Sequence, residues 1–354
     1  MKKRLFILSD THFSNERDWD LESFEKFIDW FSKYDFGNKE ECELLQLGDL
    51  TEKSKNAGKT YGLLLKFMTV CLTKFSKIYI LGGNHCMKYN SLRNEVEYSS
   101  EFLGELDDSI KLIYDETEFT ALDGKLSVLA LPFKYTTTSI ENYYNNNLKP
   151  ELYTNHYNLI CGHVTIFDEK FKIVDGIDLK KFNFDHAVFG HIHNRCGTNA
   201  KYYPGSIMPF RKSEEKTELP RCIKVIDEDN NELDEIQLPI FRQYHTINFQ
   251  IEKPEYKRNS TDIVHVYELT NCDEKTIINF CSEYYIKKSI TQNVLNIENI
   301  VNNSGDDDKI NDENVKNLLL EDDFVILEKM CKDNDIILKR KTKALLRELL
   351  TNKK

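Results

Sequence analysis

The chain has 354 residues, with 59 aspartates and glutamates against 48 lysines and arginines, and a net charge of −11. A hydrophobic fraction of 40% beside 30% charged residues is typical of a folded globular protein and excludes a disordered or fibrous chain. No window approaches the roughly 18 consecutive apolar residues that a membrane-spanning helix needs. The acidic balance argues against a nucleic-acid coat protein, but it leaves room for an enzyme that contacts DNA through a local basic groove or a partner.

The first residues, MKKRLFILSDTHF, predict a β-strand and not a signal peptide. The apolar run stops at Ser9-Asp10, and no small-residue cleavage site follows it. The nine cysteines contain no CxxC motif and show no regular spacing. We therefore expect reduced thiols and a cytoplasmic location.

Short apolar runs alternate with helical patterns over the first two thirds of the chain, which predicts a layered α/β core. The uneven spacing of the later strands favours a mixed sheet or two facing sheets. The expected strands are Arg4–Ser9, Glu43–Gly48, Lys77–Gly82, Leu126–Leu131, Tyr157–Cys161, Ala187–Phe189, and a hairpin of Cys222–Ile226 with Glu232–Leu238. The expected helices are Leu21–Tyr34, Tyr61–Cys71 and Leu92–Leu106. The helix Tyr61–Cys71 is apolar on nearly every side, so it should be buried or lie in an interface.

The pattern changes after about residue 243. A strand at Asp262–Leu269, a helix at Asp273–Tyr285 and a strand at Val294–Ile297 predict a small βαβ unit. The polar stretch NNSGDDDKINDEN reads as a linker, and two apolar-striped helices, Val315–Lys332 and Ile336–Thr351, follow it. The predicted domains are therefore 1–242, 243–301, a linker at 302–314, and a helical tail at 315–354.

Side chains that ligate hard metals follow five of the expected strands. The motifs are Asp10-Thr11-His12, Gly48-Asp49, Gly83-Asn84-His85, Gly162-His163 and His191-Ile192-His193. Strands of an α/β core end at one edge, so these loops can converge although they are far apart in the sequence. Aspartate, asparagine and neutral histidine suit Mn²⁺, Fe²⁺ or Zn²⁺. Two such ions about 3.5–4 Å apart can clamp a phosphoryl group, activate a water and stabilise the leaving oxygen.

Each of these motifs alone is more often structural than functional. Five of the nine histidines, however, fall in the motifs, and each of them follows an apolar run. Chance alone does not account for that order. The other four histidines follow no such pattern and are interpreted as core or surface residues; they are His156, His186, His245 and His265.

The ordered set D-x-H, G-D, G-N-H, G-H and G-H-x-H resembles the calcineurin-like metallophosphoesterase superfamily. Within it, FILSDTHF, GDL, GNH, GHIH and the YPGS stretch at 203–206 resemble the SbcD and Mre-eleven DNA-repair nucleases. The resemblance is strong over residues 1–210 and weak to about residue 300. It implies an α/β (α+β) fold: a two-sheet β-sandwich core flanked by helices, a small βαβ DNA-capping domain and a C-terminal helical tail.

The resemblance also implies the roles of the residues. One metal ion, expected to be Mn²⁺, would take Asp10, His12, Asp49 and His193. The second would take Asp49, Asn84, His163 and His191, so that Asp49 bridges the two ions. His85 would not be a ligand, but would face the phosphate, stabilise developing charge and help to protonate the leaving group. Glu52 stands where the Mre-eleven nucleases usually have histidine and many SbcD relatives have aspartate.

Three functions compete at this point. The first is a metal-dependent DNA nuclease, acting as an exonuclease on duplex ends and an endonuclease on single strands. The second is a metallophosphoesterase acting on small nucleotides or phosphoproteins, and the third is a scaffold that has lost the metals. The complete ligand set argues against the third, and the extra residues 243–354 favour the first, because small-substrate members can be much shorter.

The nuclease interpretation implies partners. The resemblance predicts DNA as substrate, an SbcC-type coiled-coil ATPase bound by the C-terminal tail, and a homodimer formed by the helices Tyr61–Cys71 and Leu92–Leu106. No membrane association is expected.

Overall fold

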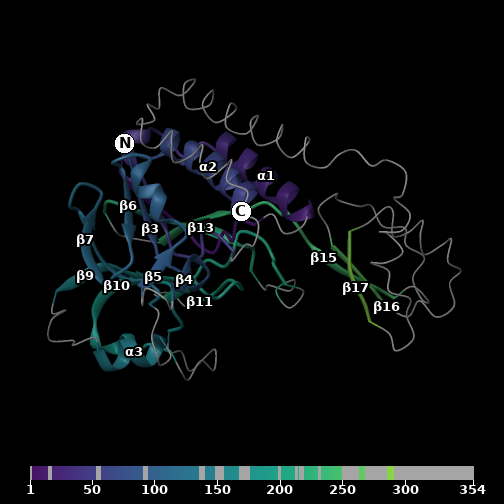
Figure 1. Ribbon diagram of the computed structural model, residues 1–354. Helices are drawn as coiled ribbons and strands as arrows, with labels where there is room; N and C mark the ends of the chain where they lie inside the picture. The colour runs from purple at the N-terminus through teal and green to yellow at the C-terminus, as the bar shows by residue number, and fades with distance from the viewer. Residues whose placement is uncertain are drawn as a thin grey trace, which may run out of the picture.

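The computed structural model describes residues 2–14, 18–52, 57–90, 95–134, 140–147, 155–166, 176–197, 201–211, 214, 219–229, 233–248, 263–267 and 285–290. Two six-stranded sheets form the centre of the described chain, and helices flank them (Figure 1). This mixed α/β architecture is the sandwich core that the sequence predicts.

The first sheet has the strand order β14-β13-β1-β2-β3-β6. Its strands β1, β2, β3 and β6 run parallel, and the hairpin β13–β14 is added antiparallel beside β1. Their bounds are Arg4–Leu8 for β1, Cys42–Gln46 for β2, Lys77–Leu81 for β3, Ile110–Ile113 for β6, Cys222–Asp227 for β13 and Leu233–Gln237 for β14.

The second sheet has the order β11-β12-β10-β9-β8-β7. Strands β8, β9, β10 and β12 are parallel, whereas the edge strands β7 and β11 pair antiparallel with their neighbours. The bounds are Thr117–Ala121 for β7, Leu126–Leu131 for β8, His156–Gly162 for β9, Asn183–Phe189 for β10, Cys196–Gly197 for β11 and Lys201–Tyr203 for β12.

Alternation along β1 shows how the layers form. Leu5 and Ile7 enter the apolar cluster between the two sheets, which Val128 and Leu159 of the second sheet also join. Phe6 and Leu8 join a second cluster that includes buried residues of both α1 (Asp18–Lys33) and α2 (Ala57–Lys74). A third cluster joins the outer face of the second sheet to α3 (Ile140–Asn147) through Tyr144. The strand period of two therefore sends apolar side chains to both faces, as a sheet buried on both sides requires.

The expected helix Leu92–Leu106 is wrong. The structure has a hairpin of β4 (Met87–Asn90) and β5 (Glu95–Tyr98), followed by a 3₁₀ turn at Glu101–Glu105. Tertiary contacts hold this arrangement: the Tyr98 ring stacks on Tyr114 with centroids 3.7 Å apart, and the Ser99 N–H donates to the Cys86 carbonyl over 2.7 Å. Further 3₁₀ turns lie at Lys39–Glu41, Asn84–Cys86 and Leu179–Lys181.

The apolar character of α2 is accounted for within the chain. Leu63, Leu64 and Leu65 follow one another around the helix, and each is at most 2% exposed. Because the chain itself covers this helix, its composition gives no reason to expect a partner there. The homodimer stays a prediction that rests on the family resemblance.

A three-stranded parallel sheet follows the core in the sequence. It consists of β15 (Tyr244–Asn248), β16 (Ile263–Tyr267) and β17 (Tyr285–Ile290). Strand β16 lies within the predicted strand Asp262–Leu269, and Tyr285, expected to end a helix, begins β17 instead. The rest of that helix, the strand Val294–Ile297, the linker and the two tail helices lie outside the described residues, so the domain boundaries stay predictions.

Two expectations from composition can be compared with the structure. The six cysteines in the described ranges are free thiols. Among the described helices, none combines the length and hydropathy that crossing a membrane would require.

Candidate metal centre

The carboxyl ends of five parallel strands meet at one place. Strands β1, β2 and β3 of the first sheet and β9 and β10 of the second each end within a few residues of a candidate ligand. The structure brings all seven predicted ligands together at this edge; they are Asp10, His12, Asp49, Asn84, His163, His191 and His193. The convergence follows from the parallel topology, since all these strands end on the same side.

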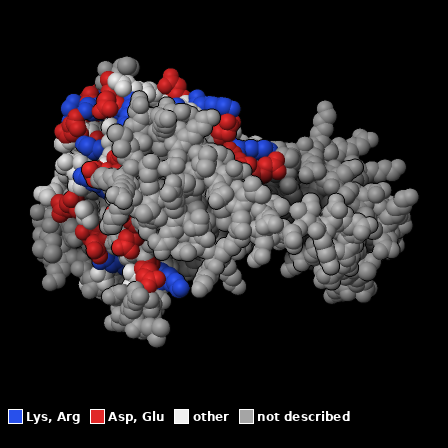
Figure 2. Space-filling view, turned by 45° about the horizontal axis from the view of Figure 1, so that its top comes forward, with Lys and Arg blue, Asp and Glu red and all other residues white. Residues whose placement is uncertain are grey.

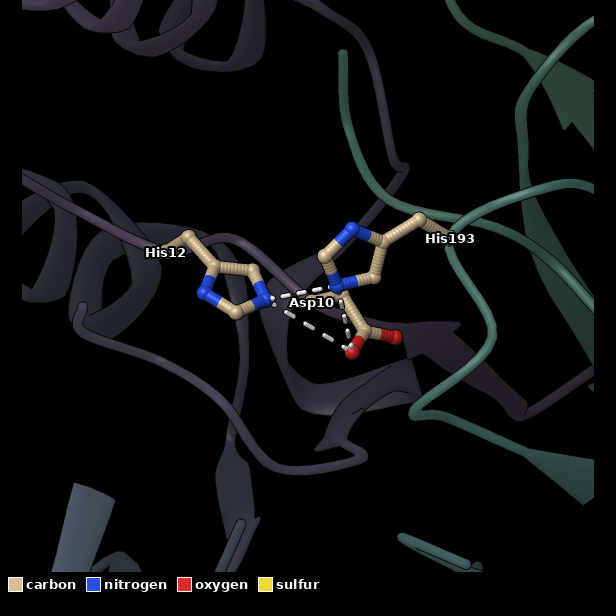
Figure 3. A group of neighbouring side chains, drawn as sticks. All are labelled: Asp10, His12 and His193. Atoms are coloured by element: carbon tan, nitrogen blue, oxygen red, sulfur yellow. Dashed lines mark hydrogen bonds and ion pairs between the residues drawn. The ribbon is translucent and has the colours of Figure 1, made fainter. Parts of the chain in front are cut away.

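Three of these side chains form a first cluster (Figure 3). The Nε2 atoms of His12 and His193 lie 2.9 Å apart. Oδ1 of Asp10 is 3.9 Å from the His12 Nε2 and 3.8 Å from the His193 Nε2. Two imidazole nitrogens and a buried carboxylate that point at one another are the donor set of a divalent cation site.

A second cluster lies beside the first. His163 Nε2 is 3.0 Å from the Asn84 Oδ1, and His191 Nδ1 is 3.1 Å from the same oxygen. Asp49 completes the cluster, with its Oδ2 3.1 Å from the His163 Nε2. Here too the donors are nitrogens and oxygens without sulfur, so the residues fit a second hard or borderline divalent ion.

Asp49 connects the two clusters. Its Oδ2, 3.1 Å from His163, is also 3.5 Å from the His12 Nε2, and its Oδ1 accepts the His85 backbone N–H over 2.7 Å. Burial by itself would raise the pKa of Asp49, but His163, His12 and His85 together hold that pKa well below its usual range. The side chain is therefore an ionised carboxylate with one oxygen fixed and the other placed between the two donor sets.

The backbone of the site is strained. Asp10, His12, Asp49 and His191 all have positive φ, at 46°, 47°, 49° and 84°. Such conformations cost about 1–3 kcal/mol each for residues other than glycine and cluster at functional sites. Gly48, with φ at 94°, turns the chain just before Asp49, and a Cβ there would lie only 2.5 Å from the His163 Nδ1. The fold thus gives up stability to aim these side chains inward.

Three of the histidines are oriented by hydrogen bonds at Nδ1. The His12 Nδ1 lies 2.8 Å from Oε2 of Glu52, and the His193 Nδ1 lies 2.9 Å from Oε1 of Glu214. The His163 Nδ1–H donates to the Leu47 carbonyl over 2.7 Å. Acceptors on Nδ1 leave the Nε2 lone pair directed into the site, the usual arrangement around metal-binding histidines.

His85 belongs to neither of these two clusters but lies beside the first: its ring centroid is 4.9 Å from that of His12, and its donor atom groups with those of His12 and Glu52. Its Nδ1 lies 2.5 Å from Oε1 of Glu52, whose other oxygen bonds His12. The His85 side chain is 23% exposed, against 2% for His12 and 0% for His163. Burial alone would raise the pKa of Glu52, but bonding to the two histidines lowers it, so Glu52 is a carboxylate shared between a candidate ligand and His85.

The pKa values of the two histidines in the second cluster are shifted in opposite directions. Burial would lower the pKa of His163, but the adjacent carboxylate of Asp49 raises it to about 9. Burial, and then the charge on His163, lower the pKa of His191 to about 4. A cation held by these two residues would therefore have to displace a proton from His163, but none from His191, near neutral pH.

Sequence reasoning misses two of the residues that shape the site. The sequence marks Glu52 only as a departure from the family pattern, and its link to both His12 and His85 comes from the structure. No motif marks Glu214 at all. It lies 21 residues beyond its partner His193, and no spacing rule connects the two.

One of the comparisons with known proteins identifies the family of this chain. The family model of the calcineurin-like phosphoesterases matches residues 3–195, more than half of the chain. The chain therefore belongs to the calcineurin-like phosphoesterase family, whose members are metal-dependent hydrolases of phosphoesters. A search of curated proteins gave no match.

Two solved structures are also similar to the chain. The phosphopantetheinyl hydrolase of Mycobacterium tuberculosis is 11% identical, with 73% of this chain and 99% of that chain covered and a TM-score of 0.34. A protein of unknown function from Aquifex aeolicus is 18% identical, with 51% and 88% covered and a TM-score of 0.27.

Proposed function

We propose that this chain is a two-metal phosphodiesterase that acts on DNA, as an SbcD-type nuclease that degrades duplex ends and cuts single strands. The observation that carries the phosphodiesterase part is the pair of donor clusters joined by one carboxylate oxygen, Oδ2 of Asp49. A histidine outside both clusters, His85, lies at their edge and supplies a proton donor that the hydrolysis of an alkyl phosphodiester needs.

The donor atoms assign residues to each ion. Asp10, His12 and His193 with Asp49 would hold one divalent ion, and Asn84, His163 and His191 with Asp49 would hold the other. These donors suit Mn²⁺, Fe²⁺ or Zn²⁺, and we propose Mn²⁺ for both sites because it is the ion that the family resemblance implies. When bound, the two ions would polarise the phosphate and lower the pKa of the attacking water.

The protein's own side chains prepare the other half of the reaction. The hydrogen bond from Nδ1 to Glu52 fixes the His85 ring and leaves Nε2 as the nitrogen that can serve the leaving oxygen. Because Glu52 holds His12 with its second oxygen, the proton donor and the first donor cluster keep a fixed spacing.

The chain beyond the catalytic core supports DNA as the substrate. The parallel sheet β15–β17 adds a structured unit after the catalytic sheets, which fits the capping domain that the resemblance predicts. On the face in Figure 2, acidic and basic side chains of the described residues are interspersed. The last 20 residues of the sequence carry seven lysines and arginines against two acidic residues.

We further propose that residues 315–354 bind an SbcC-type ATPase and that the nuclease is a homodimer.

The test uses the full chain with Mn²⁺ on three substrates: end-labelled linear duplex DNA, circular single-stranded DNA, and bis-p-nitrophenyl phosphate. Asp49→Asn protein purified in parallel is the control for contaminating nucleases. Wild type should digest both DNAs and the variant neither. Hydrolysis of the dye and of small nucleotides without any digestion of DNA would overturn the nuclease proposal and favour a small phosphoester as substrate.

A further inference from the structure

Each of the two histidines in the first cluster has a carboxylate at its Nδ1, and the two carboxylates come from different parts of the chain. Glu52 follows Asp49 closely, inside the residues that the family model matches. Glu214 lies beyond residue 195, outside that match, and its Oε1 is 2.9 Å from the His193 Nδ1. The first donor cluster therefore depends on a segment that the family match does not include.

Several hydrogen bonds fix the position of the Glu214 side chain and backbone. The Glu214 Oε2 accepts the backbone N–H groups of Phe210 over 2.8 Å and of Arg211 over 3.3 Å. The Arg221 guanidinium donates to the Glu214 carbonyl over 2.9 Å, and the residue is only 6% exposed. The Tyr244 hydroxyl, at the start of β15, donates to the carbonyl of Phe210, the residue whose N–H binds Glu214, over 2.7 Å.

We propose that Glu214 is a positioning residue that sets the tautomer of His193, and through it the affinity of the first metal site. The proposal rests on the proposed two-metal centre, but not on DNA being the substrate. An acceptor-only carboxylate at Nδ1 keeps the proton on that nitrogen. Nε2, which lies 2.9 Å from the His12 Nε2, is then unprotonated and available to a cation.

Replacement of Glu214 by glutamine should favour the other tautomer of His193 with little change in the shape of the side chain. Two backbone N–H groups, from Phe210 and Arg211, face one oxygen of Glu214, so the amide oxygen of a glutamine belongs there. The amide NH₂ then faces the His193 Nδ1, which must accept a hydrogen bond. The proton moves to Nε2, the atom that should bind the metal. Removal of such an outer partner typically weakens metal binding about 10–100-fold.

The experiment titrates Mn²⁺ into metal-free full-length protein by calorimetry and follows the electron paramagnetic resonance spectrum. Two ions joined by a shared carboxylate give a spin-coupled spectrum, whereas one ion alone gives the six-line signal of isolated Mn²⁺. Glu214→Gln should weaken one of two sites about 10–100-fold and show the six-line signal at one equivalent bound. Glu43→Gln is the matched control: Glu43 is a buried carboxylate that accepts from the Tyr79 hydroxyl over 3.1 Å, at the opposite end of β2.

A double mutant separates positioning from a general structural role. In a His193→Ala background the Glu214→Gln change should add no further loss of Mn²⁺ affinity, because its effect passes through that imidazole. Two sites of wild-type affinity in Glu214→Gln would overturn the proposal, as would a full additional loss in the double mutant. Wild-type protein that binds no Mn²⁺ would instead overturn the two-metal centre itself.

Discussion

His85 offers the sharpest test of the proposed chemistry. The substitution His85→Gln removes the imidazole but keeps a side-chain N–H that can donate to Oε1 of Glu52, as the His85 Nδ1 does over 2.5 Å. Glu52 then keeps its place, and so does His12, which its other oxygen bonds over 2.8 Å. The backbone N–H of residue 85 still donates to Asp49. Both metal sites should therefore survive in this variant.

The expected loss is confined to the chemical step. A positioned acid or base contributes about 10²–10⁴-fold in rate. At about 1.4 kcal/mol per factor of ten, this range corresponds to roughly 3–5.6 kcal/mol of barrier. We expect the upper part of that range for DNA, because its alkoxide leaving group is poor and needs the proton. p-Nitrophenolate leaves without one, so its hydrolysis should fall at least about tenfold less.

The assay compares kcat and KM of wild type and His85→Gln on DNA and on bis-p-nitrophenyl phosphate at saturating Mn²⁺. Calorimetry gives the number of bound ions for each protein. His12→Gln is the control for a ligand: it should lose metal first and recover part of its activity with excess Mn²⁺. Loss of a metal ion from His85→Gln, rescue of that variant by Mn²⁺, or equal losses on the two substrates would refute the role of His85 as proton donor.

Three further predictions concern other parts of the molecule. Asp49→Asn should weaken both metal sites together and abolish hydrolysis, because the Asp49 Oδ2 lies 3.5 Å from the His12 Nε2 and 3.1 Å from the His163 Nε2. Two tightly bound Mn²⁺ ions in a metal count of this variant would contradict the bridging role of Asp49. Burial lowers the pKa of His163, but Asp49 raises it to about 9. Mn²⁺ bound there would therefore have to displace a proton. The affinity of that site for Mn²⁺ should rise by up to about tenfold per pH unit between pH 7 and 9. Calorimetry in buffers of different ionisation enthalpy should detect the released proton. An Mn²⁺ affinity that does not change over this pH range would contradict the prediction. Deletion of residues 315–354 should preserve Mn²⁺-dependent cleavage of bis-p-nitrophenyl phosphate and lose pull-down of an SbcC-type ATPase, and equal pull-down by the shortened chain would contradict the role of the tail.

Local patterns determined much of the fold in advance. Strands such as Arg4–Leu8 and Lys77–Leu81 could be recognised because a short apolar run between turn residues has few alternatives. The hairpin β13–β14 could be recognised from Asp229-Asn230-Asn231, a turn sequence that needs no distant contact. The motifs that hold the seven candidate ligands could be recognised for the same reason, since each follows such a strand, and the family resemblance then separated these residues from His85.

Where local and tertiary preferences disagreed, the sequence misled. Leu92, Val96, Leu103 and Leu106 have a spacing that fits a helix, yet Glu95–Tyr98 pair with β4. Stacking of Tyr98 on Tyr114 and burial of Leu103 outweigh the helical preference of the segment. The residue distribution around α2 was similarly ambiguous, because an apolar helix can be covered by its own chain or by another.

The sequence by itself determined which residue types end the strands, and therefore that a metal-dependent phosphoesterase was the leading hypothesis. Only the tertiary structure decided how those residues are held. Glu52 joins His12 to His85, and Glu214 orients His193 from 21 residues away. Hydrogen bonds of this kind depend on where loops from separate strands come to lie, and no periodicity along the chain encodes that placement. The donor atoms could be read from the sequence, but the tautomers and charges that ready them for a cation are properties of the fold.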